Sequence, residues 1–166
     1  MRLGILLLVG VSLSGGCGGS NTAALDPDTT PTPLVIELLV HTTDGREVLF
    51  QLDDQRVLHF GGGLNARGGC TQPAGELIEG QLAQLWRLIV DGNLLHAEGT
   101  FFGKPQRVRF GGYVRIPSGR YEIHAIDDEV PALHELSRLL FNYQAELRYG
   151  DVIEPIETRL KAESDK

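Results

Sequence analysis

The feature that most constrains this fold is a series of three short runs of alternating apolar and polar residues. Residues 34–42 place four apolar side chains on one side of an extended chain, as in a strand with one buried face: Leu34, Ile36, Leu38 and Val40. An Asp44-Gly45 pair separates this run from a second one at residues 47–52, and Asp-Gly in that place is a strong hairpin signal. A third run covers residues 56–60. We therefore expect the domain to begin as an antiparallel β-meander.

Two later segments have the periodicity of amphipathic helices. Residues 80–90 carry apolar side chains at the spacing that forms one face of a helix: Leu82, Leu85, Trp86 and Ile89. A second helix is expected to begin after the acidic run 127–129, because acidic residues ahead of the first turn and Pro131 in its first position are both favourable. The apolar stripe of this second helix consists of Leu133, Leu136, Leu140 and Tyr143.

Three further strands are expected at residues 94–102, 106–116 and 120–126. The glycine-rich stretch 61–70 is expected to be a flexible loop, since repeated glycine disfavours regular structure. The order of elements is strands, helix, strands, helix. The sequence therefore predicts an α+β domain, with an antiparallel β-meander sheet and two amphipathic helices.

The N-terminus has the organisation of an export signal. One basic residue, Arg2, precedes an uncharged apolar run at residues 3–13, which is too short to span a bilayer about 30 Å thick as a helix. Small residues then lead to a cysteine, in the order Leu13-Ser14-Gly15-Gly16-Cys17. This arrangement resembles the lipobox of bacterial lipoproteins, although Ser14 stands where that family usually has leucine. By this resemblance residues 1–16 are a signal peptide and Cys17 is the lipid-modified first residue of the mature chain.

The resemblance to bacterial lipoproteins implies an exported protein that is anchored to a membrane by the lipid at Cys17. No acidic residue follows Cys17 closely, which by the same resemblance favours the outer membrane if the cell has one. Cleavage near residues 22–24 is an alternative and would give a secreted soluble protein. An uncleaved N-terminal anchor is a second alternative, and the short apolar run disfavours it.

Four regions follow from these assignments. After the signal peptide, the lipidated Cys17 and a tether rich in Gly, Ser, Thr and Pro occupy residues 17–33, and this composition is typical of a flexible linker. Residues 34–150 form a single α+β domain, since about 130 residues after the tether suffice for one core and not for two. Residues 151–166 form a charged C-terminal tail, with a possible short edge strand at residues 152–156.

The charge and cysteine content limit the partners. The chain has 15 basic and 22 acidic side chains, and an acidic surface repels phosphate backbones, which disfavours nucleic acid. Any membrane contact is expected through the lipid, because no later segment is apolar enough to cross a bilayer. If Cys17 carries a lipid, Cys70 has no intramolecular partner, and otherwise a disulfide between the two is possible.

The sequence contains no recognisable catalytic, metal or cofactor motif. None of the serines after the signal peptide lies at a strand-turn-helix elbow, the five histidines are scattered, and there is no Cys-x-x-Cys. Cys70 could meet His59, but no third group completes a catalytic set. We therefore expect no metal and no cofactor. An enzyme would need polar groups that converge in a pocket, such as strand histidines that meet Asp53 or Asp127.

Four arginines form the one candidate binding surface: Arg107, Arg109, Arg115 and Arg120. The first two share a strand face opposite Val108 and Phe110, and the other two lie on neighbouring strands. Guanidinium groups gathered on one sheet face could bind a carboxylate-rich protein or an anionic envelope polymer. The alternative is a solvated face on which acidic residues are interleaved.

The order of elements over residues 45–145 resembles small bacterial envelope proteins built from a repeated meander and helix, including emfourin-like inhibitors of thermolysin-type metallopeptidases. The resemblance covers layout and leucine-rich helices, and it assigns no site residue. It favours a binding module over an enzyme. The first hypothesis is a membrane-tethered binding domain. The second is an inhibitor of a secreted or periplasmic protease that uses a rigid loop at residues 61–69 or 102–105, and the third is an uncharacterised enzyme.

Overall fold

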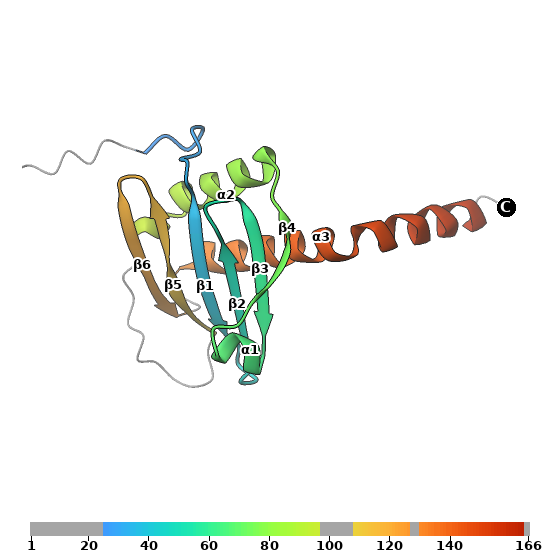
Figure 1. Cartoon of the computed structure of the whole chain (residues 1–166), viewed down its shortest axis with the longest axis horizontal. Helices are drawn as coiled ribbons and strands as arrows, with labels where there is room; N and C mark the ends of the chain where they lie inside the picture. Colours follow the sequence, from blue (N-terminus) through green and yellow to red (C-terminus); the bar gives the residue numbers. More distant parts are fainter. Residues whose placement is uncertain (1–24, 97–107, 127–129, 165–166) are drawn as a thin grey trace, which may run out of the picture.

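The computed structural model describes residues 25–96, 108–126 and 130–164. Within these ranges the chain forms one six-stranded antiparallel sheet, and two helices pack on one of its faces (Figure 1). The strands lie in the order β4-β3-β2-β1-β5-β6. The α+β class expected from the sequence is confirmed. The elements in chain order are β1 (Val35–His41), β2 (Glu47–Leu52), β3 (Val57–Gly62), α1 (Leu64–Arg67), β4 (Gln72–Glu76), α2 (Glu79–Asp91), the short 3-10 helix η1 (Leu94–His96), β5 (Arg109–Ile116), β6 (Gly119–Ile126) and α3 (Pro131–Ser164).

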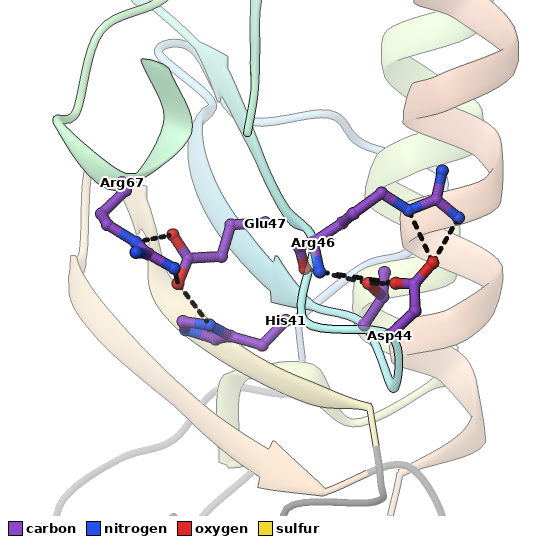
Figure 2. A network of polar contacts seen from close by, with 6 residues as sticks. His41, Asp44, Arg46, Glu47 and Arg67 are labelled. Atoms are coloured by element: carbon purple, nitrogen blue, oxygen red, sulfur yellow. Dashed lines mark hydrogen bonds and ion pairs between the residues drawn. The ribbon is translucent and has the colours of Figure 1, made fainter. Parts of the chain in front are cut away.

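The predicted meander is present as β1, β2 and β3. Gly45 adopts a φ of 80° in the turn between β1 and β2, which glycine accepts without steric cost. The Asp44 carboxylate accepts hydrogen bonds from Arg46 Nε, at 2.7 Å, and from the Thr42 hydroxyl (Figure 2). The hydrogen bond from Arg46 and then that from Thr42 hold the pKa of Asp44 far below its ordinary value. This turn therefore fixes the register in which Leu38 faces Phe50 across the hairpin.

The core lies between the sheet and the stripes of α2 and α3. Each central strand sends alternate residues inward, and the helical stripes predicted from the sequence meet them. Side chains with no exposed surface come from β1, β3, α2, β5, β6 and α3: Leu38, Leu58, Leu85, Ile89, Phe110, Val114, Ile123, Leu133, Leu136 and Leu140. The two amphipathic segments were thus predicted correctly in place and orientation.

The C-terminal region differs from the prediction. α3 begins at Pro131, as expected, but continues to Ser164, and its last part projects past the sheet (Figure 1). The edge strand proposed at residues 152–156 is therefore wrong, because this stretch is helical. Residues 157–163 consist mostly of strong helix formers (Glu157, Arg159, Leu160, Lys161, Ala162 and Glu163), which favours the continuation, whereas Pro155 within it is unfavourable in a helix.

The stretch expected to be a glycine-rich loop contains structure. α1 forms within it, and β4 follows and pairs with β3, with an irregular register between Leu58 and His59. β4 contains Pro73 and Gly75, which a strand tolerates at the edge of a sheet. The strand expected at residues 94–102 begins instead with η1, and its remainder lies outside the described residues.

The described part of the expected tether contacts the domain. Trp86 Nε1 donates a hydrogen bond of 2.9 Å to the backbone oxygen of Asp26, and Arg87 lies 2.6 Å from the Asp28 carboxylate. Residues 25–33 are thus attached to α2, while residues 1–24, which include Cys17, lie outside the described ranges. Among the described helices, none is long and apolar enough to span a membrane.

Candidate functional site

The face of the sheet opposite α2 and α3 carries most of the strand polar residues. Because the strand registers are defined, the residues on this face form rows that run across the strands. The central row consists of Glu122, Tyr113, Glu37, Gln51 and His59. A neighbouring row consists of Arg120, Arg115 and Val35. Polar side chains that are distant in sequence are therefore brought side by side.

A shallow open groove of about 360 Å³ lies across the middle of these rows. Its lining includes six polar side chains from the strands and the β2–β3 turn: Glu37, Gln51, Asp53, His59, Tyr113 and Arg115. Val35 and Leu52 also belong to the lining, but both are buried, with 7% and 1% of their surface exposed. A concave surface with several polar groups around a partly apolar floor is the usual form of a small-ligand site. We refer to this feature as the sheet groove.

The floor of the sheet groove is ordered by a chain of hydrogen bonds. Gln51 Nε2 donates to Glu37 Oε2 at 3.0 Å, and the Thr71 hydroxyl donates to Gln51 Oε1 at 2.7 Å. This chain fixes the orientation of the Gln51 amide. It also leaves Glu37 Oε1 without a hydrogen-bond partner among the described residues, and Glu37 belongs to the groove lining, so this oxygen can accept a hydrogen bond from a ligand.

Asp53 and His59 form one wall. His59 Nε2 lies 3.0 Å from Asp53 Oδ2, and Asp53 Oδ1 accepts the backbone N–H groups of Gln55 and Val57, each at 2.9 Å. Burial acts to raise the pKa of Asp53, but the hydrogen bonds from His59, Val57 and Gln55 outweigh it, and this pKa lies below its ordinary value. One strand histidine thus meets Asp53, whereas the Thr71 hydroxyl in the groove lining donates to Gln51 and not to this pair.

The Asp53 carboxylate should stabilise the β2–β3 turn both by the hydrogen bonds that it accepts and by its negative charge. Asp53→Ala, which removes all three hydrogen bonds, should lower the free energy of unfolding by about 1 to 2 kcal/mol at pH 7. Asp53→Asn keeps an oxygen for the two backbone donors and should cost less. Because the folded pKa of Asp53 is depressed, its charge-dependent stabilisation is present above about pH 4 and is lost as the pH falls. Urea unfolding from pH 3 to 7 would test this, and an equal pH slope in the wild type and Asp53→Asn would contradict it.

The opposite wall is formed by Tyr113 and Arg115 of β5, and β6 lies next to it outside the groove lining. The Arg120 guanidinium lies 3.7 Å from the centre of the Tyr113 ring, and Arg120 Nε also donates to Glu122 at 2.7 Å. Tyr113 Oη and the exposed Arg115 guanidinium have no polar partner among the described residues. Both groups therefore remain available to a ligand in the groove.

Of the four predicted arginines, the three that the structure describes lie on one sheet face by their register, but they do not form one cluster. Arg115 and Arg120 are paired residues on β5 and β6, while Arg109 pairs with Ile126 at the other end of the ladder. Six residues along a strand separate Arg109 from Arg115 by roughly 20 Å. Arg107 lies outside the described residues. The alternative, a face with interleaved acids, fits Arg120, which pairs with Glu122.

A second polar cluster attaches α1 to the sheet. Glu47 at the start of β2 accepts from Arg67 Nε at 3.0 Å and from Arg67 Nη2 at 3.3 Å, and His41 Nδ1 lies 3.3 Å from the same carboxylate (Figure 2). The bond from Arg67 is the main reason that the pKa of Glu47 is lowered. This bidentate contact joins α1 to β2, and Leu64 at the start of α1 is 82% exposed.

The contacts of Cys70 and His59 do not join these two residues. The exposed Cys70 thiol lies 3.7 Å from the Gly68 backbone oxygen, whereas His59 is engaged by Asp53. In the described ranges, no group of three His, Cys, Asp or Glu side chains is placed to hold a metal ion. Asp127 lies outside those ranges.

Comparison with known proteins adds no family to this description. No model of a known protein family matches the sequence, and no curated protein is significantly similar to it. The function is therefore argued from the site itself. Sequence analysis overlooked Glu37, Gln51 and Tyr113, although each is an outward-facing polar residue in an alternating strand. The hairpin register would have placed Glu37 beside Gln51, since Asp44-Gly45 defines the turn.

Proposed function

We propose that this protein is an exported lipoprotein whose domain binds a ligand in the sheet groove. The observation that supports it most is the groove itself, in which Glu37, Tyr113 and Arg115 each keep a polar group without a partner among the described residues. Evolution toward stability alone gives no reason to gather such groups on one hollow surface. A catalytic function is less favoured, since the Thr71 hydroxyl in the lining donates to Gln51 and His59 is bonded to Asp53, so these contacts do not join a nucleophile to a base.

The proposed membrane anchor is the lipid on Cys17. The apolar run at residues 3–13 and the small residues before Cys17 support it. Because residues 25–33 are attached to α2, only residues 17–24 separate the lipid from the domain, and even fully extended they reach roughly 28 Å. The domain would therefore stay close to the membrane surface.

Cys17→Ala should release the protein from membranes into the soluble fraction and abolish its labelling by a fatty-acid analogue. The expected release is nearly complete, because the described helices include no span that could replace the lipid. Cell fractionation with labelling measures both effects. Cys70→Ala is the matched control and should leave anchoring unchanged. A Cys17→Ala protein that stays in the membrane fraction would contradict the lipoprotein assignment.

Ligand binding in the groove can be tested without knowing the ligand. Isotope-labelled mature protein is titrated with extracts of the native cell envelope, and the backbone amide signals are followed by NMR. We expect changes centred on Glu37, Gln51, Tyr113 and Arg115. An extract series that leaves all of these signals unchanged would reject the groove as the binding site.

A second candidate function is inhibition of a secreted or periplasmic protease. The observation that favours it is Leu64, an exposed apolar side chain on a segment that the Arg67 to Glu47 bonds hold in place. A rigid loop loses little entropy on entering a partner's pocket. In the same NMR titration, protease inhibition predicts signal changes at residues 63–67 and not at the residues of the sheet groove. Leu64→Asp should then abolish inhibition of a thermolysin-type peptidase, whereas Tyr113→Phe should not.

A further inference from the structure

The sheet groove offers side chains and almost no backbone to a ligand. Its floor is formed by β1 and β2, which are both central strands, so their backbone N–H and C=O groups are used in the ladders to their neighbours. A peptide that adds to a sheet needs a free strand edge for its own hydrogen bonds, and the groove runs across strands. Recognition must therefore depend on side chains, which disfavours an extended peptide as the ligand.

The charges in the groove disfavour a polyanion as well. The lining contains three carboxylates, from Glu37, Asp53 and Asp54, and one guanidinium, from Arg115. The lining remains net negative whichever protonation state His59 adopts. An anionic envelope polymer, which the arginines suggested from the sequence, would be repelled by most of these groups. The ligand that fits is either uncharged or cationic.

The mixture of hydrogen-bond donors and acceptors in the lining favours an uncharged ligand over a cation. Glu37 Oε1 can accept a hydrogen bond, the Arg115 guanidinium can only donate, and Tyr113 Oη can do both. A simple cation cannot use Arg115, whereas a hydroxyl group can both donate to Glu37 and accept from Arg115. The Tyr113 ring adds aromatic surface for the carbon-bound hydrogens of a sugar ring, on the face that the Arg120 guanidinium does not cover.

We propose that the sheet groove binds an uncharged carbohydrate, whose hydroxyl groups are recognised by Glu37, Tyr113 and Arg115. The inference rests on the groove being the binding site of this protein. Glu37 and Tyr113 are directly paired on β1 and β5, and Arg115 lies two residues beyond Tyr113 on the same face, so neighbouring hydroxyls of one sugar can meet all three. The bonded pair of Asp53 and His59 would close the far end of the groove.

The test uses the full mature chain and a panel of defined tetrasaccharides. The uncharged members are tetramers of N-acetylglucosamine, of α-linked glucose, of β-linked glucose and of mannose. The charged comparisons are tetragalacturonate and the peptide tetraglutamate. Binding is followed by NMR at 50 and 500 mM NaCl. We expect at least one uncharged tetrasaccharide to shift the groove signals, with an affinity that changes less than about twofold with salt, because screening acts on ionic attraction.

Variants localise the binding. Glu37→Gln and Tyr113→Phe should each weaken it, Glu37→Gln by roughly tenfold or more because a hydrogen bond to a charged group is lost or weakened. Glu122→Gln is the control, since its carboxylate bonds to Arg120 and lies outside the groove lining. The inference is overturned if no uncharged tetrasaccharide binds, if only the anionic probes bind, or if Glu122→Gln weakens binding as much as Glu37→Gln. In these cases groove signals that still respond to envelope extract would leave the proposed function intact.

Discussion

Gly112→Ala should lower the free energy of unfolding by more than about 3 kcal/mol, and the melting temperature by roughly 10 °C or more. Gly112 lies on β5 with a φ of 149°, a backbone conformation that residues with a Cβ atom rarely adopt. A Cβ atom there would lie 2.0 Å from the Glu37 backbone oxygen and 2.8 Å from its carbonyl carbon. Both groups belong to backbone in the centre of the sheet, so neither can move aside cheaply.

Gly80→Ala is the matched control for this substitution. Gly80 is in the first turn of α2, and a Cβ atom there meets nothing within 4 Å. Alanine should therefore raise stability there by up to about 1 kcal/mol, since glycine is a poor helix former. Urea unfolding of both variants gives the comparison. Equal stability of Gly112→Ala and the wild type would mean that β1 and β5 do not approach as closely as described.

The residues of the groove could not be derived from the sequence, because strands that are distant in the sequence lie side by side there. Alternation identified the inner residues of β1 correctly and placed Phe110 of β5 on the face opposite the arginines, because apolar burial has a period of two that any register shares. Which outer residues meet depends on the order of strands, and β5 joins the sheet beside β1 after a long connection through α2. The neighbours Glu37 and Tyr113, at opposite ends of that connection, therefore had no local signal.

The failure to predict β4 has the same origin in tertiary contacts. β4 contains Pro73 and Gly75, which argue against a strand, yet Leu147 of α3 packs against Gly75, where a Cβ atom would lie 3.0 Å from it. α3 covers this edge strand, and a local pattern does not contain that information. By contrast, the contact of Asp53 with His59 spans one tight turn, and the sequence did raise Asp53 as a partner for a strand histidine.

Trp86→Ala should lower the free energy of unfolding by about 3 to 5 kcal/mol, because it deletes the largest side chain of the core. Trp86 is 1% exposed and lies on the buried stripe of α2. The native indole should accordingly fluoresce as a buried ring, and since it is the only tryptophan its emission reports on this core alone. Circular dichroism in urea measures the stability of the variant. A loss below about 1 kcal/mol would contradict the packing of α2 against the sheet.

Trp86→Phe separates core packing from attachment of the N-terminal segment. Phenylalanine keeps much of the apolar volume but lacks the Nε1–H group that bonds to Asp26, so residues 25–33 should lose protection in hydrogen exchange while the sheet stays protected. Arg87→Ala is the control. It removes an exposed ion pair with Asp28 and should change stability by less than about 1 kcal/mol. If Trp86→Phe leaves residues 25–33 protected, the hydrogen bond from Trp86 to Asp26 is not what attaches this segment. The short reach of the lipid anchor would then depend on other contacts between the segment and the domain.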